Sequence, residues 1–124
     1  MKVIEIAFVV YPVTDLKRAR GFYEGVLGLV ESRSFGNEAQ GFVEYDIGAG
    51  TLAIGNGAAG FHPSAGGGCA SLEVDDFEKA AQRLKASGCP IILPEYESPV
   101  CFMMVVSDPD GNSVMIHRRK PGHS

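Results

Sequence analysis

An internal repeat constrains the fold of this chain more than any other feature of its sequence. The segments Val13–Leu16 (VTDL) and Val74–Phe77 (VDDF) lie 61 residues apart, and each follows an apolar run and precedes a helical pattern. Such self-similarity indicates two copies of one supersecondary unit. At this offset Phe8 corresponds to Cys69, each seven residues before the matching aspartate. The chain should therefore contain two similar modules whose corresponding positions can be compared.

The first half of the sequence predicts a strand, a helix and three further strands. Val3–Val10 is an apolar run suited to a buried strand, and Thr14 or Asp15 can cap the helix that follows. Apolar residues recur at helical spacing over Leu16–Leu27, and Gly28 should end this helix. The next β-rich runs are Leu29–Phe35, Gln40–Ile47 and Thr51–Gly55.

The second half predicts the same order of elements. Gly68–Val74 is a strand, Asp75 or Asp76 caps a helix, and Gly88 ends that helix. The side chains expected to face inward from it are Phe77, Ala80, Ala81 and Leu84. Three strands follow, near Ile91–Pro94, Val100–Val106 and Ser113–Arg118.

These elements predict an α+β fold of two βαβββ modules within a single domain, a size class that suits 124 residues. Module 1 should span about residues 1–56 and module 2 about residues 68–120. The intervening residues 57–67 are rich in Gly, Ala, Pro and Ser, which is typical of a flexible linker.

Composition disfavours several classes of partner. Eleven Lys and Arg against fifteen Asp and Glu give a net charge of -4 without a basic stripe, so we expect no nucleic acid partner. Residues 1–10 are too short and too polar at Glu5 for a membrane span, and they lack a small-residue cleavage site. The sequence therefore predicts a cytoplasmic protein without a membrane partner. Cys69, Cys89 and Cys101 have no CxxC spacing and should be reduced thiols.

Three motifs in a fixed order carry a family resemblance. They are VTDLKRARGFYEGVLGL, LEVDDFEKAAQRLKASG and the closing DPDGNSVMI, in which Asp108–Asn112 has the composition of a tight turn. With them the chain resembles the vicinal oxygen chelate superfamily, which includes glyoxalase I, extradiol dioxygenases, fosfomycin-resistance enzymes and bleomycin-resistance proteins. The resemblance covers nearly the whole chain, and it is specific for fold but weak for function.

This resemblance implies that the paired modules form a cup-shaped incomplete barrel, in which the catalytic members hold one divalent metal through four strand positions. Carried over to this sequence, the first position, a His in the family, is Phe8, and the second, a Glu, falls at about Ala53. The third, a His, is Cys69, and the fourth, a Glu, is Met115.

These four residues are a poor ligand set for a divalent metal. Phe8 and Ala53 have no donor atom, while Cys69 and Met115 offer only sulfur. We therefore expect no metal and no other cofactor, and a cup lined by apolar, adaptable side chains. The function predicted first is that of a metal-free small-molecule-binding protein for an apolar or aromatic ligand, comparable to the bleomycin-resistance proteins, which sequester a drug.

Two other functions remain open from the sequence. The first is a glyoxalase-like lyase or isomerase, or a dioxygenase-like enzyme, with a divergent active site. His117 lies two residues after Met115 and should point the same way, so His117 or Cys69 could act as acid or base. The second is an interaction module whose cup is filled by its own side chains, which pocket volume would distinguish.

Several further residues could reach a ligand, but periodicity does not fix their faces. These are Glu44, Tyr45, Tyr96 and Glu97, and His62 of the linker, which is expected to be solvated. The nearly unbroken apolar run Val100–Ser107 is typical of a strand covered on both faces. A second copy of the chain could provide that cover, so we expect a homodimer.

Overall fold

The computed structural model describes residues 1–122 and divides the chain into two compact units. Unit 1 comprises Met1–Pro63, and unit 2 begins at Ser64. Each unit contains its own four-stranded sheet and its own helical segment.

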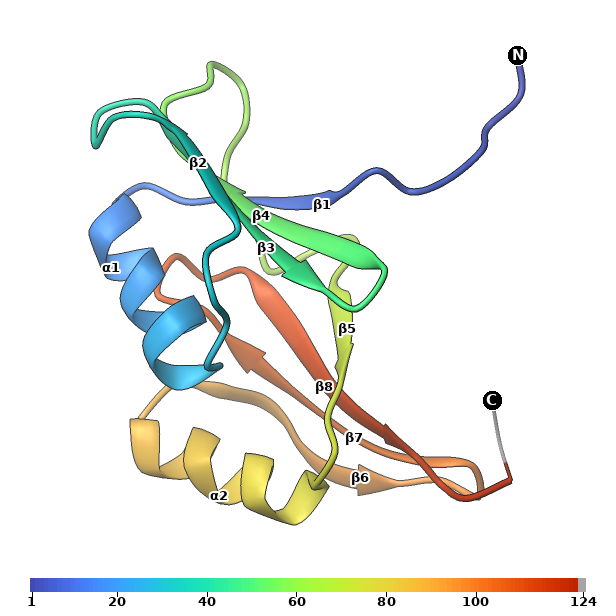
Figure 1. Cartoon of the computed structure of the whole chain (residues 1–124). Coiled ribbons are helices and arrows are strands. Elements are labelled where there is room, and N and C mark those ends of the chain that lie inside the picture. Colours follow the sequence, from blue (N-terminus) through green and yellow to red (C-terminus); the bar gives the residue numbers. More distant parts are fainter. Residues whose placement is uncertain (123–124) are drawn as a thin grey trace. The chain divides into compact units, whose positions relative to one another are not determined.

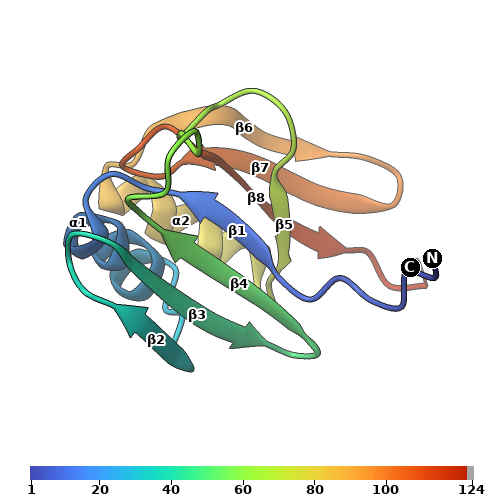
Figure 2. The ribbon, with the colours of Figure 1, turned by 90° about the horizontal axis from the view of Figure 1, so that it is seen from above.

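Unit 1 contains the strands β1 (Val9–Pro12), β2 (Arg33–Gly36), β3 (Gly41–Ile47) and β4 (Gly50–Gly55). Its helical segment consists of α1 (Leu16–Arg20) and the π-helix η1 (Gly21–Val26). The strand order in the sheet is β1-β4-β3-β2, which can be followed in Figure 2. β1 is parallel to β4, and the other neighbours are antiparallel.

Unit 2 repeats this topology with β5 (Ala70–Glu73), α2 (Phe77–Ser87), β6 (Ile91–Glu97), β7 (Cys101–Ser107) and β8 (Ser113–Arg119). Its strand order is β5-β8-β7-β6, with β5 parallel to β8, and α2 lies along this sheet (Figure 1). The predicted α+β fold of two βαβββ modules is confirmed. Neither sheet closes into a barrel within the described residues.

The repeat is visible in the helix caps. The carboxylate of Asp15 accepts a hydrogen bond from the backbone N–H of Arg18, and that of Asp76 accepts one from Lys79, each at 3.0 Å. Of the predicted alternatives, Thr14 or Asp15 and Asp75 or Asp76, the second residue of each pair is therefore the cap. Gly28 and Gly88 follow the helical segments in the left-handed conformation, with φ of 74° and 77°. None of these helices, in the range 1–122, is long and apolar enough to cross a membrane.

The apolar spacing predicted one continuous α-helix for the first helical segment. The structure instead has the short helix α1 followed by the π-helix η1. The backbone N–H of Leu27 bonds to the carbonyl of Phe22, five residues earlier, at 3.0 Å. This π-turn presents Tyr23 to the core between Tyr11 and Tyr45, with ring centroids 6.1 and 6.4 Å apart. Tyr23 and Tyr45 are fully buried, so three stacked rings join the helical segment to the sheet of unit 1.

Three predicted strands are shorter than expected, among them β5, which covers only Ala70–Glu73 of the expected Gly68–Val74. The prediction of a buried strand over Val3–Val10 is wrong, since β1 begins only at Val9 and the apolar residues Val3, Ile4 and Ile6 are exposed. The cause lies in the partner strand: Val9 pairs with Leu52, and β4 begins at Gly50, so the residues before Ala7 have no strand of this sheet beside them. The strand expected over Leu29–Phe35 is likewise reduced to β2, because only Arg33–Gly36 pairs with β3.

The DPDGN segment forms the predicted turn, with Gly111 at a φ of 87°. It also fixes part of the linker. The buried Asn112 donates its amide N–H to Asp108 Oδ2 at 2.9 Å, and its Oδ1 accepts from the backbone N–H of Ser64 at 3.1 Å. Ser113 Oγ donates to the carbonyl of Ala65 at 3.1 Å. Residues 64–65 are therefore held by Asn112 and Ser113 within unit 2, although the composition of residues 57–67 is that of a flexible linker.

Candidate functional site

Each sheet has one face covered by the helical segment of its own unit, and the opposite face is called the helix-free face below. In unit 1 the side chains of Tyr11, Val43, Tyr45 and Ile54 are buried on the helix side. Because successive side chains of a strand alternate between faces, the residues between them belong to the helix-free face.

The two predicted binding residues of unit 1 share this face. Ala53 is paired with Val10 of β1 and with Glu44 of β3, and it is fully buried. Phe8 precedes β1 by one residue and lies two residues before Val10. Its ring contacts Phe42 edge to face, with centroids 5.6 Å apart.

Sequence reasoning missed two aromatic residues beside Phe8. Phe42 alternates with the buried Val43, and Phe35 of β2 stands directly opposite Phe42. Phe8, Phe35 and Phe42 are called the phenylalanine patch. Phe8 and Phe35 are 44% and 56% exposed, although apolar rings of this size are normally buried.

A small residue leaves room for this patch. A Cβ atom at Gly55 would come within 3.0 Å of Cδ1 of Phe42, so the ring of Phe42 lies over the backbone of β4. Any side chain at Gly55 would displace that ring. The register of β3 with β4, which puts Phe42 opposite Gly55, is what brings these residues together.

The same face carries an ion-pair cluster at the other end of β3. Arg33 donates from Nε to Glu44 Oε1 at 2.5 Å and from Nη2 to Asp46 Oδ1 at 2.6 Å. Thr51 Oγ1 also donates to Asp46 Oδ1, at 2.8 Å. The pKa of Asp46 lies below its ordinary value, and the hydrogen bonds from Arg33 are the largest cause. Glu44 thus lies on the helix-free face, but its carboxylate is already engaged by Arg33.

In unit 2 the structure places Met115 and His117 on one face, as their spacing predicted. Met104, Val106, Val114 and Ile116 are buried on the side of α2. Met115 and His117 of β8 alternate with these residues and stand opposite Val105 and Met103 of β7. All four side chains are partly exposed, so the helix-free face of unit 2 is an accessible apolar surface with one imidazole.

His117 has a carboxylate partner that sequence reasoning missed. Its Nδ1 lies 2.6 Å from Oε1 of Glu73, and the backbone N–H of Arg119 donates to Oε2 of Glu73 at 2.7 Å. Burial raises the pKa of Glu73, but the bonds from Arg119 and His117 outweigh it, so the pKa lies below its ordinary value. Only the parallel register of β5 with β8, which pairs Glu73 with His117, could have predicted this contact.

The remaining candidates fall outside these clusters. Cys69 precedes β5 by one residue and is exposed, whereas Cys101 is buried, with its Sγ 3.3 Å from Ser98 Oγ. His62 is exposed in the segment between β4 and β5. Tyr96 is exposed and stands opposite Met103, on the helix-free face.

Two of the polar candidates point toward the helix side of their sheets. The phenol of Tyr45 donates to Glu24 at 2.8 Å, and burial, followed by this bond, raises the pKa of Tyr45. Glu97 of β6 is paired with Phe102 of β7, and the ring of Phe102 stacks on Phe77 of α2. The carboxylate of Glu97 accepts a hydrogen bond from Lys120. Neither side chain belongs to a helix-free face.

The four family ligand positions do not supply a divalent metal site. Phe8 and Ala53 bring no donor, and Met115 brings a thioether among apolar neighbours. Across residues 1–122 no three His, Cys, Asp or Glu side chains gather in a way that could hold a metal ion. The residues present therefore do not fit the metal that catalytic members of the resembled family use.

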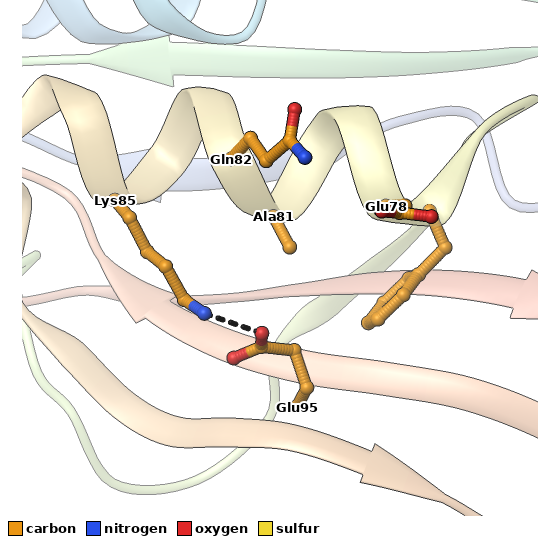
Figure 3. A pocket seen from close by; sticks show the side chains of 6 residues that line it. Glu78, Ala81, Gln82, Lys85 and Glu95 are labelled. Carbon is orange, nitrogen blue, oxygen red and sulfur yellow. Dashed lines mark hydrogen bonds and ion pairs between the residues drawn. The ribbon is translucent and has the colours of Figure 1, made fainter.

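The grooves of unit 2 lie on the other side of its sheet. One, of about 300 Å³, runs between α2 and β6, where Lys85 of the helix reaches Glu95 of the strand (Figure 3). A second, of about 370 Å³, lies at the start of α2 around Phe77 and Phe102. Both are surface grooves beside the helix, and neither contains a residue that the sequence predicted to bind a ligand.

A family model described as Glyoxalase/Bleomycin resistance protein/Dioxygenase superfamily matches residues 5–116 of this chain. No curated protein gives a significant match. Solved structures of similar fold include TnmS3, an antibiotic binding protein from Streptomyces sp. CB03234, with a TM-score of 0.78 at 19% identity over 97% of this chain and 99% of that one.

Two further structures have different functions. The fosfomycin resistance protein FosX from Listeria monocytogenes has a TM-score of 0.78 at 15% identity, covering 97% of both chains. Lactoylglutathione lyase from Agrobacterium tumefaciens has a TM-score of 0.73 at 22% identity, covering 94% of this chain and 95% of that one. At such identities the similarity establishes the fold alone.

Proposed function

We propose, from the premise that this chain belongs to the glyoxalase/bleomycin resistance protein/dioxygenase superfamily, that it binds an apolar or aromatic small molecule without a metal. The observation that carries this proposal is the phenylalanine patch, whose rings at Phe8 and Phe35 are about half exposed. Exposed aromatic clusters of this kind mark binding surfaces. The binding residues proposed from the sequence remain Phe8, Ala53, Cys69, Met115 and His117.

The energetics of the patch favour an aromatic ligand. Covering one large apolar side chain contributes about 1.5–3 kcal/mol, and an aromatic pair adds about 0.5–1.5 kcal/mol. Phe8 and Phe42 already adopt the edge-to-face arrangement, so a planar ligand would meet rings that hold each other in place. TnmS3 shares the fold and is an antibiotic binding protein, so this fold is compatible with binding a small organic molecule.

The protein purified without added metal should bind a neutral aromatic probe such as N-phenyl-1-naphthylamine, and EDTA should leave the Kd unchanged. The reason is that apolar contact, and not coordination, would hold the ligand. Probe fluorescence measures the Kd without interference, because the chain contains no tryptophan. Elemental analysis of the same sample should give far less than one metal ion per chain.

The opposite result is equally clear. About one Ni, Zn, Fe or Mn ion per chain, removed by chelation together with probe binding, would contradict the metal-free proposal. It would favour the alternative of a lyase, isomerase or dioxygenase with a divergent site.

We also propose that the protein is a cytoplasmic homodimer. Support for the dimer comes from β6, an edge strand that exposes the apolar side chains of Ile92, Leu93 and Tyr96. Light scattering should report a mass near twice 13.2 kDa. A particle of monomer mass at micromolar concentration would refute this assembly.

A further inference from the structure

We propose that His117 and Glu73 form a polar anchor on the helix-free face of unit 2, and that Nε2 of His117 accepts a hydrogen bond from the hydroxyl group of a phenolic or enolic ligand. This inference rests on the proposed function, since it names the chemical class of the small molecule. Glu73 acts as a positioning residue, because it touches the imidazole and not the ligand.

The contacts of Glu73 determine which ring nitrogen faces outward. One carboxylate oxygen lies 2.6 Å from His117 Nδ1, and the other accepts the backbone N–H of Arg119 at 2.7 Å. Guanidinium nitrogens of Arg118 and Arg119 lie 3.9 and 3.6 Å from the same carboxylate. These groups favour the ionised carboxylate, and a carboxylate without a proton can only accept.

Nδ1 of His117 is therefore the donor in this pair. A neutral imidazole with its proton on Nδ1 carries a lone pair on Nε2, which is then the acceptor available to another molecule. The hydrogen bond to Glu73 fixes this tautomer and the orientation of the ring. The side chain of His117 is 24% exposed, so the ring is partly covered yet reachable.

The surroundings of the imidazole select an aromatic partner. Met103 stands opposite His117 on β7, and Met115 precedes it by two residues on the same face. Thioethers make favourable contacts with aromatic rings and adapt to their shape. In such apolar surroundings a hydrogen bond is stronger than in water.

The surroundings of His117 favour a phenol or an enol over an aliphatic alcohol. An aliphatic alcohol would use the same acceptor but would gain nothing from the methionines beyond simple burial. A phenol or an enol combines an acidic O–H with a flat apolar body.

The test compares 2-naphthol with 2-methoxynaphthalene, which has the same rings but no hydroxyl proton. The wild-type protein should bind 2-naphthol about tenfold more tightly, the difference expected for one hydrogen bond with a well-oriented acceptor. His117→Phe should reduce the affinity for 2-naphthol to that for the ether and leave the ether's Kd unchanged. Probe fluorescence measures each Kd, and Glu95→Gln, which removes a carboxylate from the opposite side of the sheet, is the matched control.

A second readout isolates the positioning role of Glu73. Two-bond proton–nitrogen NMR correlations of the imidazole should show the proton of His117 on Nδ1 in the wild type. Glu73→Leu should move it to Nε2 and weaken 2-naphthol binding several-fold, whereas Glu73→Gln, whose amide oxygen can still accept from Nδ1, should restore both. The two side chains lie outside the core, so these variants should fold, and circular dichroism checks this.

The possible outcomes separate the two proposals. Equal binding of the phenol and the ether by the wild type, an unchanged preference in His117→Phe, or a wild-type proton on Nε2 would overturn the anchor and leave the proposed function standing. If neither compound binds but N-phenyl-1-naphthylamine does, the anchor alone fails; if none of the three binds, both proposals fail. If His117→Phe does not fold, the NMR spectrum of the wild type and the Glu73 variants decide the question.

Discussion

Phe8→Asp should weaken the binding of N-phenyl-1-naphthylamine by about a hundredfold, equivalent to about 2.8 kcal/mol. The substitution removes a ring that covers ligand surface, worth about 1.5–3 kcal/mol, and it brings a carboxylate that must lose water when the ligand binds. It also removes the edge-to-face partner of Phe42. Fluorescence titration of wild type and variant under the same conditions measures the ratio of the Kd values.

Val30→Asp is the matched control for this experiment. It introduces the same charge in the same unit at an apolar residue that is more exposed than Phe8 and lies between η1 and β2, outside the sheet. Its Kd should stay within about twofold of the wild type, because surface substitutions away from a site have small effects. If Phe8→Asp binds the probe as well as Val30→Asp does, Phe8 is not a binding residue.

Tyr23→Ala should lower the free energy of unfolding by about 4 kcal/mol, in the range found for removal of a buried aromatic side chain. Tyr23 is fully buried, and its ring contacts Tyr11 on one side and Tyr45 on the other. Phe22 adds an edge contact with a centroid distance of 5.1 Å. Alanine would leave a cavity among all three neighbours. Urea denaturation followed by circular dichroism measures the change.

Phe61→Ala provides the comparison, because Phe61 is an aromatic residue in an exposed position between β4 and β5, away from the edge strand β6. Its effect on stability should be below about 0.5 kcal/mol. Equal losses for the two variants would mean that the stacked tyrosines of unit 1 do not contribute more than a surface ring.

The sequence predicted those elements whose signals are local. Asp15 and Asp76 cap the two helical segments, and Gly28 and Gly88 follow them, because caps and left-handed glycines depend on a few neighbouring residues. The prediction of a strand over Val3–Val10 was wrong because a strand needs a neighbouring strand to pair with, and β4 is too short to extend beside the first residues of this run. Hydrophobicity alone carries no information on the length of the neighbouring strand.

The candidate site was predicted less completely for the same reason. Alternation along β8 was enough to group Met115 with His117, because both lie on one strand. The contacts between Glu73 and His117, and between Phe35 and Phe42, each depend on the register of two strands. Register is decided by packing and turn geometry across the sheet, which single-strand periodicity does not reveal.

The π-helix η1 also explains an irregularity in the internal repeat. The capping residues Asp15 and Asp76 are 61 positions apart, but Gly28 and Gly88, which follow the helical segments, are only 60 apart. A turn closed by a bond to the fifth preceding residue contains one residue more than an α-helical turn. The first module thus carries a single-residue insertion relative to the second, and the π-turn between Phe22 and Leu27 absorbs it without moving the cap or the terminal glycine out of place. Aligning the two halves of the chain requires a one-residue gap within Gly21–Val26.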